Sequence, residues 1–220
     1  MRVLLVHGLG GTTATMTPLA DALRRVGIDS SSILLPGHGT SPDHLATVGW
    51  DDWLGAVVDA CVADDGVDAI VGQSLGGALA LAAAASGAPT AAVVAISTPC
   101  PDPDAGDGLE WRLARGHTTI EAVLAEGETG YPTVPLAALL EMARGLLATD
   151  LTAVTVPTLL VQGLADDVVD PASVDVLASA LERVPVPGPR VIRLADTGHV
   201  ATMTPRVDDI ASSIAALLGA

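Results

Sequence analysis

Short apolar runs alternate with longer segments of helical spacing along most of the chain. Each run is rich in leucine or β-branched residues, and its length suits a strand buried on both faces of a sheet. The runs lie at Val3–Val6, Ser32–Leu35, Ala69–Val71, Ala92–Ile96, Thr158–Val161 and Val191–Leu194. The helical segments lie at Pro18–Val26, Asp51–Ala63, Leu75–Ala85, Ser173–Arg183 and Arg206–Leu218. This alternation predicts an α/β fold with a mostly parallel sheet and helices on both sides.

One segment, residues 100–150, interrupts the alternation. It contains two helix-like pieces, around Trp111–Glu126 and Pro135–Ala148, and we expect no strand between them. A segment of this length is too long for a bare connection, so it is predicted to fold as a small helical cap over the upper edge of the sheet. The 220 residues then form a single domain, with a core of 1–99 and 151–220 and a cap insertion.

The charge of the chain limits its partners. Its net charge is −16, from 26 acidic residues against 10 basic ones, and all of the basic residues are arginines. A chain without a basic patch has little with which to neutralise phosphates, so we expect no nucleic-acid partner. Neutral small molecules suit this charge better than anions do.

Cysteine usage and the apolar segments indicate a cytoplasmic protein. Cys61 and Cys100 are too few for a disulfide framework, and no Cys/His cluster has zinc-site spacing. The apolar run before His7 is too short for a signal peptide. The long apolar stretch Leu75–Ile96 is interrupted by polar residues and glycine from Ser86 onward, which favours a buried helix and strand over stable membrane insertion. We expect a monomer or a weak homo-oligomer.

Ser74 stands in a Gly-x-Ser-x-Gly motif, GQSLGG, where a strand is expected to pass into a helix. Gly72 and Gly76 would permit the sharp, strained turn that presents a serine nucleophile. The alternative is that Ser74 only caps the helix N-terminus, for which serine is favoured. A nucleophilic serine needs a neighbouring base and a carboxylate that orients the base.

Both partners are available in loops that follow later strands. His199 follows Val191–Leu194 in the sequence ADTGHVATM, and Asp166 and Asp167 follow Thr158–Val161 in QGLADDVVDP. Active sites of parallel sheets lie beyond the carboxyl ends of the strands, so these loops are expected to meet near Ser74. The alternative for His199 is a structural role in its turn.

The sequence VHGLGG after the first strand offers the second half of an oxyanion site. Its glycines allow the Leu9 N–H to turn toward a bound carbonyl oxygen, while the Leu75 N–H at the helix start supplies the other donor. His7 and His38 lie in glycine-rich loops, where histidines more often hold the loop shape than act as bases. Further candidates for substrate binding are Gly8, Gln73, Cys100, Trp111, Tyr131 and Val200.

Five blocks in this order, HGLGG, LLPGHG, GQSLGG, GLADDVVDP and TGHV, resemble α/β-hydrolases of the bacterial carboxylesterase and monoacylglycerol lipase type. The resemblance implies a three-layer α/β-hydrolase sandwich and ester hydrolysis through an acyl-serine, without cofactor or metal. The family pattern Gly-x-x-Asp, counted from Gly163, selects Asp166 as the triad acid. Since the chain opens on the strand before HGLGG, where the family has two further strands, the sheet is expected to have about six.

The resulting hypothesis is a serine hydrolase for neutral esters with small to medium acyl groups, monoacylglycerols among them. Thioester, lactone and carbon–carbon bond hydrolysis use the same residues, and the fold cannot separate them. The alternative from another class is a ligand-binding protein on the same fold with slow or absent turnover. An intact set of Ser74, Asp166 and His199 argues against it, because a pure binder has no need for a strained turn.

Overall fold

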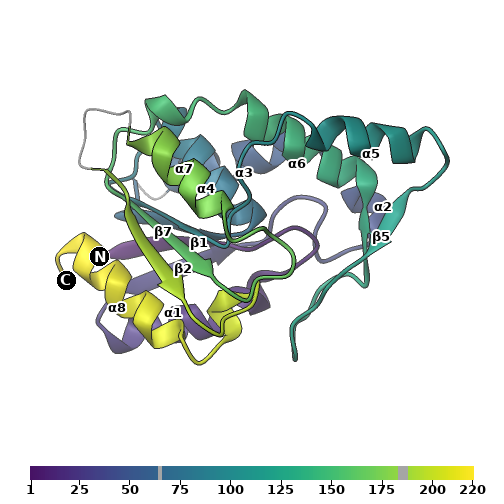
Figure 1. The fold of residues 1–220 in the computed structure, drawn as a ribbon. Helices are drawn as coiled ribbons and strands as arrows, with labels where there is room; N and C mark the ends of the chain where they lie inside the picture. The colour runs from purple at the N-terminus through teal and green to yellow at the C-terminus, as the bar shows by residue number, and fades with distance from the viewer. Residues whose placement is uncertain (64–65, 183–187) are drawn as a thin grey trace.

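The fold is described from a computed structural model, which covers residues 1–63, 66–182 and 188–220. Six parallel strands form one sheet in the order β2-β1-β3-β4-β7-β8 (Figure 1). The strands are β1 (Arg2–Val6), β2 (Asp29–Ile33), β3 (Ala69–Gln73), β4 (Val93–Ile96), β7 (Thr158–Gly163) and β8 (Arg190–Leu194). The predicted α/β architecture with a six-stranded sheet is confirmed.

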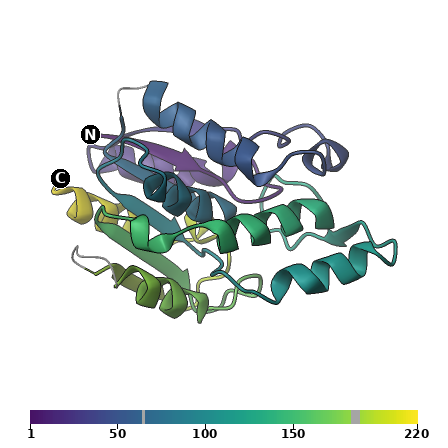
Figure 2. The ribbon, with the colours of Figure 1, turned by 90° about the horizontal axis from the view of Figure 1, so that it is seen from above.

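Helices cover both faces of the sheet and complete three layers (Figures 1 and 2). One face carries α1 (Thr17–Arg25) and α8 (Val207–Leu218), and the other carries α3 (Trp50–Ala63), α4 (Leu75–Ala85) and α7 (Ser173–Leu181). Successive strand side chains point to opposite faces. Val3 and Leu5 therefore join the core under α1 and α8, whereas Leu4 and Val6 join the core under α3 and α4.

The long apolar stretch resolves into helix α4 followed by strand β4, as predicted. Nearly every residue of α4 is buried, because the helix lies between the sheet, α3, α6 (Leu136–Ala148) and the short turn η2 (Leu151–Ala153). A helix that is apolar all round suits such a site. Within the described residues, no helix has both the length and the hydropathy that a membrane span needs.

One edge strand, β2, is displaced from its predicted position, whereas β8 forms within one residue of it; both are more exposed than predicted. β2 spans Asp29–Ile33 rather than Ser32–Leu35, and several of its residues are exposed, as are parts of β8. An edge strand needs no continuous apolar run. The serines of β2 therefore did not indicate a strand, and the prediction was shifted to the apolar residues that follow them. The predicted C-terminal end of α7, at Arg183, lies outside the described residues. Three short elements complete the sheet-and-helix part of the chain: η1 (Thr13–Met16), α2 (Pro42–Leu45) and η3 (Ala201–Met203).

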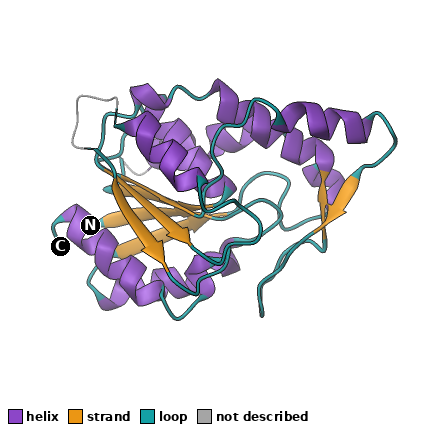
Figure 3. Ribbon diagram, viewed as in Figure 1, coloured by secondary structure: helices purple, strands orange, loops and turns teal. Residues whose placement is uncertain are grey.

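The insertion, residues 100–150, is not wholly helical. Its second helix, α6, forms as predicted, but its first helix, α5, spans Ala105–Leu113, and a two-stranded antiparallel ladder follows (Figure 3). The ladder pairs β5 (Thr119–Glu121) with β6 (Thr133–Pro135). Two features explain why the expected helix over Trp111–Glu126 is wrong. Gly116 adopts a φ of +81°, which ends α5, and the β-branched residues after it favour a strand.

Two buried histidines fasten the loop after β1. His7 Nε2 accepts a hydrogen bond from the Leu35 N–H (3.1 Å), so its Nδ1 carries the proton and donates to Gly8 O (2.9 Å). His38 Nε2 accepts from the Gly10 N–H (3.0 Å), and its Nδ1 donates to a carbonyl of its own loop. Each ring is therefore a neutral imidazole with one donor and one acceptor. The prediction that these histidines hold loop shape is consistent with these bonds.

Burial, and to a smaller extent the nearby His38, lowers the pKa of His7 to about 4, although the hydrogen bond to Gly8 opposes this shift. Burial also lowers the pKa of His38. Between pH 6.5 and 4 the unfolded chain binds a proton on His7 that the folded protein does not bind. The free energy of unfolding therefore falls as the pH falls through this window. Lowering the pH from about 7.5 to about 5 should cost about 2 kcal/mol through His7.

Urea unfolding of the wild type and of His7→Gln at both pH values measures this contribution. The glutamine carbonyl can still accept from Leu35, but it does not titrate. Between the two pH values, the free energy of unfolding of the wild type should fall by about 2 kcal/mol more than that of the variant. The same pH dependence in both proteins would contradict the assignment.

Candidate active site

Ser74 occupies the turn between β3 and α4. Its φ of 56° and ψ of −117° are a conformation that residues other than glycine rarely adopt. The Ser74 N–H donates to Ile96 O (2.8 Å), and Ser74 O accepts from the N–H groups of Gly77 and Ala78. Ser74 occupies the N-cap position of α4, but its side chain caps no N–H of the helix, which argues against the alternative that it only caps the helix. The backbone thus holds a strained turn while the hydroxyl stays available.

Glycines make this turn possible. A Cβ atom on Gly72 would lie 2.0 Å from the carbonyl carbon of Gly76, and one on Gly76 would lie 2.1 Å from Val6 O. Neither distance is tolerable, so any larger residue would push α4 away from β1 and β3. At Gly8 the space is limited by Ser74 itself, because a Cβ atom added to Gly8 would lie 3.3 Å from the Cβ of Ser74. The loop after β1 therefore lies directly against the serine.

His199 and Asp166 come from the loops that follow β8 and β7. His199 Nδ1 lies 3.0 Å from Asp166 Oδ2 and 3.1 Å from Oδ1. Because Nδ1 donates to the carboxylate, Nε2 of the neutral ring is free to accept a proton. No hydrogen bond links the Ser74 hydroxyl to the His199 ring within the described residues. Such contacts often tighten only when substrate is bound.

The surroundings of Asp166 keep it ionised. Burial by itself would raise the pKa of Asp166, but the bond and charge interaction with His199 and the N–H groups of Val169 and Val168 outweigh it, so the pKa is lowered. Gln162 Nε2 adds a third kind of donor, at 3.0 Å from Asp166 Oδ2. Asp167, in contrast, is exposed. The geometry therefore favours Asp166 as the carboxylate that orients the imidazole.

Two glutamines at the ends of strands support the pair, and neither role was predicted. Gln162, in β7, holds the carboxylate as described. Gln73, in β3, donates from Nε2 to the His199 backbone carbonyl (2.8 Å) and so ties the His199 loop to the strand that leads into Ser74. The signal that could have found them is an amide side chain at the end of an otherwise apolar buried run, since a buried amide requires partners.

Two backbone N–H groups come from positions next to the serine or its contacts: Leu75 directly follows Ser74, and Leu9 directly follows Gly8, which packs against Ser74. Leu75 begins α4, where the first N–H groups have no partner inside the helix. Neither amide hydrogen-bonds another group among the described residues. The bonds of His7 and His38 to the adjoining peptides shape the loop that contains Leu9. Two unpaired donors at a helix start and a glycine-rich loop suit an oxyanion.

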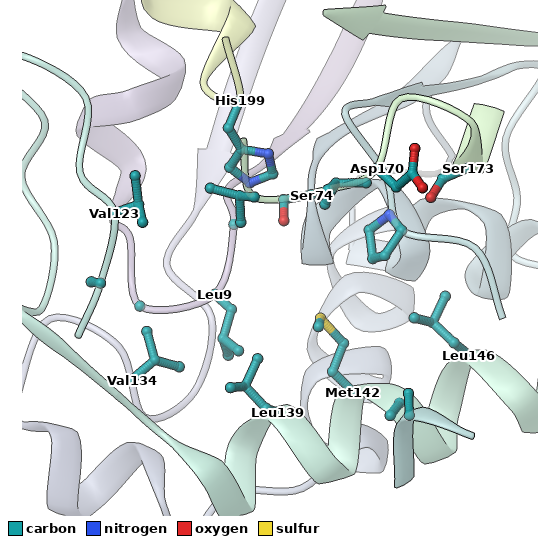
Figure 4. Close-up of a pocket in the computed structure, with 18 of the residues that line it drawn as sticks. Leu9, Ser74, Val123, Val134, Leu139, Met142, Leu146, Asp170, Ser173 and His199 are labelled. Carbon is teal, nitrogen blue, oxygen red and sulfur yellow. The ribbon is translucent and has the colours of Figure 1, made fainter. Parts of the chain in front are cut away.

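Ser74 and His199 both line a cavity of about 840 Å³. Figure 4 shows Leu139, Met142 and Leu146 of α6 on the wall opposite them. The volume is typical of sites for small organic molecules, and the walls are mostly apolar. Besides the His199 imidazole, four acids line it: Asp102, Glu121, Glu128 and Asp170. No arginine is among the described lining residues.

Most of the sequence-predicted binding residues line this cavity. They are Gly8, Gln73, Cys100, Tyr131 and Val200. Trp111 does not line the cavity, so its prediction is wrong: it lies on the outer face of α5, 57% exposed, with the Arg115 guanidinium 3.8 Å from its ring centre. Within the described ranges, no three His, Cys, Asp or Glu side chains are grouped so that they could hold a metal ion.

Comparison with known proteins agrees with the fold. The sequence matches the Alpha/beta hydrolase family over residues 3–211. It is 28% identical over 215 residues to the thermostable monoacylglycerol lipase of Bacillus sp. (strain H-257). The aligned region covers 91% of this chain and 83% of that enzyme.

Two solved structures are similar over nearly the whole chain. One comes from the work on LipS and LipT, two metagenome-derived lipolytic enzymes, with a TM-score of 0.84, 26% identity, and coverage of 99% of this chain and 93% of the other. The other is the Paleococcus ferrophilus monoacylglycerol lipase, with a TM-score of 0.79, 16% identity, and coverage of 99% and 94%. The family match spans most of the chain, and the resemblance drawn from the five sequence blocks is confirmed: this protein belongs to the alpha/beta hydrolase family and is similar to its lipases and esterases.

Proposed function

We propose that this protein is a carboxylic ester hydrolase that cleaves neutral esters with small to medium acyl groups through an acyl-serine intermediate. The observation that carries the proposal is the combination of a strained Ser74, a His199 ring bonded through Nδ1 to Asp166, and one cavity that Ser74 and His199 share. The similarity to monoacylglycerol lipases makes monoacylglycerols a candidate substrate class.

In the proposed mechanism, His199 Nε2 removes the proton from the Ser74 hydroxyl as its oxygen attacks the ester carbonyl carbon. The N–H groups of Leu9 and Leu75 stabilise the negative charge that forms on the carbonyl oxygen. His199 then protonates the leaving alcohol, and the carbon–oxygen bond to the alcohol breaks. A water molecule, deprotonated by the same ring, attacks the acyl-serine and releases the carboxylic acid and Ser74. Asp166 keeps the imidazole in one tautomer throughout.

The lining of the cavity supports neutral substrates. The wall formed by α6 offers apolar contact for an acyl chain, whereas Asp102, Glu121, Glu128 and Asp170 disfavour a second negative charge. Since ester hydrolysis itself creates a carboxylate, these acids also favour departure of the product. The protein is proposed to need no cofactor.

The proposal places the enzyme in the cytoplasm, as a monomer or weak homo-oligomer. Cys61 and Cys100 are both free thiols, which suits a reducing compartment. We also propose that the insertion acts as the cap of a single domain, because α6 and the β5–β6 ladder contribute residues to the cavity wall.

Loss of Ser74 or His199 tests the proposal directly. Hydrolysis of p-nitrophenyl esters from acetate to palmitate should show an optimum chain length in the wild type. Ser74→Ala and His199→Ala should each lower kcat by about 1,000-fold or more, because the remaining groups cannot replace an activated nucleophile. Labelling by a fluorophosphonate should disappear in Ser74→Ala.

Ser173→Ala is the matched control, because Ser173 lines the same cavity and is not part of the proposed triad. It should retain both activity and labelling. Ester hydrolysis that survives in Ser74→Ala would overturn the assignment of the nucleophile. A wild type without ester activity and without labelling would favour the ligand-binding alternative.

The choice between the adjacent acids is tested by Asp166→Asn and Asp167→Asn. The first change removes the negative charge that holds the His199 tautomer, and kcat should fall by about 1,000-fold or more. The second concerns an exposed carboxylate, and kcat should stay within about twofold of the wild type. Steady-state kinetics on one ester suffice, and equal losses in the two variants would refute the choice of Asp166.

The acidic lining is tested with a pair of esters of similar size. We expect kcat/KM for p-nitrophenyl butyrate to exceed that for mono-p-nitrophenyl succinate by about tenfold or more at low salt. Added salt and the double variant Glu128→Gln/Asp170→Asn should each reduce the ratio of the two kcat/KM values, because each weakens repulsion of the anionic ester. A preference that responds to neither change would show that shape, and not charge, selects the substrate.

A further inference from the structure

The insertion contacts the loop after β1 through its residues 129–131. The Tyr131 N–H donates to Gly10 O at 2.8 Å, and the Thr12 hydroxyl donates to Thr129 O at 3.3 Å. Gly130 lies so close that a Cβ atom there would be 3.0 Å from Gly10 O. The segment that helps to form the cavity wall therefore packs on the same loop that carries the Leu9 N–H.

The side chain of Tyr131 makes a second connection to this region. Its hydroxyl donates to Gly37 O (2.9 Å) and accepts from the Thr40 N–H (2.8 Å). Its ring stacks on His38 with an interplanar angle of 10° and a centroid distance of 6.5 Å. His38 in turn accepts from the Gly10 N–H (3.0 Å). Both backbone groups of Gly10 are thus held, one by the Tyr131 backbone and one by the ring on which Tyr131 stacks.

The position of Gly10 matters because of its neighbours. Gly10 has a φ of +75°, which makes the chain turn immediately after Leu9. The Leu9 N–H belongs to a planar peptide whose carbonyl, Gly8 O, is held by His7 Nδ1 and by the Gly11 N–H (3.2 Å). A shift at Gly10 would move Gly11 and release that carbonyl. The direction of the Leu9 N–H therefore depends on how firmly Gly10 is held.

From these contacts we infer that Tyr131 is a positioning residue for the oxyanion donor Leu9, and that it acts through Gly10 and His38 rather than by binding substrate. This inference rests on the proposed function. The Tyr131 hydroxyl already has both an acceptor and a donor, so a hydrogen bond to substrate would break one of them. The insertion then contributes to the rate of the reaction as well as to the shape of the cavity.

The test compares Tyr131→Phe with Trp111→Phe. The first change removes the bonds to Gly37 and Thr40 that hold the ring in its stack on His38, and it keeps the backbone bond to Gly10. The second changes an aromatic residue of the same insertion whose ring contacts Arg115 at the surface. In Tyr131→Phe, kcat for p-nitrophenyl butyrate should fall by about tenfold while KM stays within about twofold, since an oxyanion donor acts mainly in the transition state.

An alkylboronic acid gives a second measure, because its tetrahedral adduct with serine places an oxygen in the oxyanion site. Its inhibition constant should rise by the same factor as kcat falls, and the pH profile should be unchanged because His199 and Asp166 are not altered. Trp111→Phe should leave all of these values unchanged. A raised KM with an unchanged kcat would instead identify Tyr131 as a substrate contact and overturn the inference.

Hydrogen exchange provides a readout that does not require activity. Amides in a peptide covering residues 7–12 should exchange faster in Tyr131→Phe than in the wild type or in Trp111→Phe. Unchanged exchange together with unchanged kcat overturns the inference, whereas a wild type that lacks Ser74-dependent hydrolysis overturns the proposed function. If Tyr131→Phe unfolds at the assay temperature, Thr12→Val should change exchange and kcat in the same direction, because it removes the bond from the insertion to this loop at Thr129 together with the cap on the Ala14 N–H. No change in that variant would overturn the inference as well.

Discussion

The close contact of three backbones around Ser74 is the constraint on which the site depends. Gly72 and Gly76 bring β3 and the start of α4 within a distance that excludes any Cβ atom, and Val6 O of β1 lies equally close to Gly76. This contact forces the chain to turn at Ser74 with a positive φ. The surrounding fold maintains this strained conformation, because α4 is buried on nearly all sides and β3 is central in the sheet. A rigid interior thus holds Ser74 in a conformation that local backbone preferences disfavour.

The parallel sheet explains why distant residues meet at this turn. Strands β1, β3, β7 and β8 all end on the same side of the molecule, so the loops with Leu9, Asp166 and His199 converge on Ser74. Side-chain amides then fix the details. Gln73 holds the His199 backbone and Gln162 holds the Asp166 carboxylate, so each member of the pair is fastened to the end of a strand.

Prediction from sequence succeeded where one local pattern determines the outcome. Continuous apolar runs identified the four inner strands, and the Gly-x-Ser-x-Gly motif identified the turn, because burial on two faces and a positive φ restrict the residue types severely. It failed where tertiary contact decides. No local pattern restricts the residue types at three places: the serines of edge strand β2, the short β5–β6 ladder, and Trp111, which points outward. The supporting roles of Gln73 and Gln162 were not predicted, because they depend on loops far away in the sequence.

The insertion connects the wall of the cavity to the loop that carries the proposed donor. α6 faces Ser74 across the cavity, and the segment that follows the β5 strand contacts both Gly10 and the loop at Gly37. A loop rich in glycine gains little rigidity from its own backbone, so the proposed donor at Leu9 depends on external contacts for its position. Here these contacts come from two buried neutral histidines and from the insertion itself. Changes in the insertion that alter which substrates fit should therefore also alter the rate at which they react.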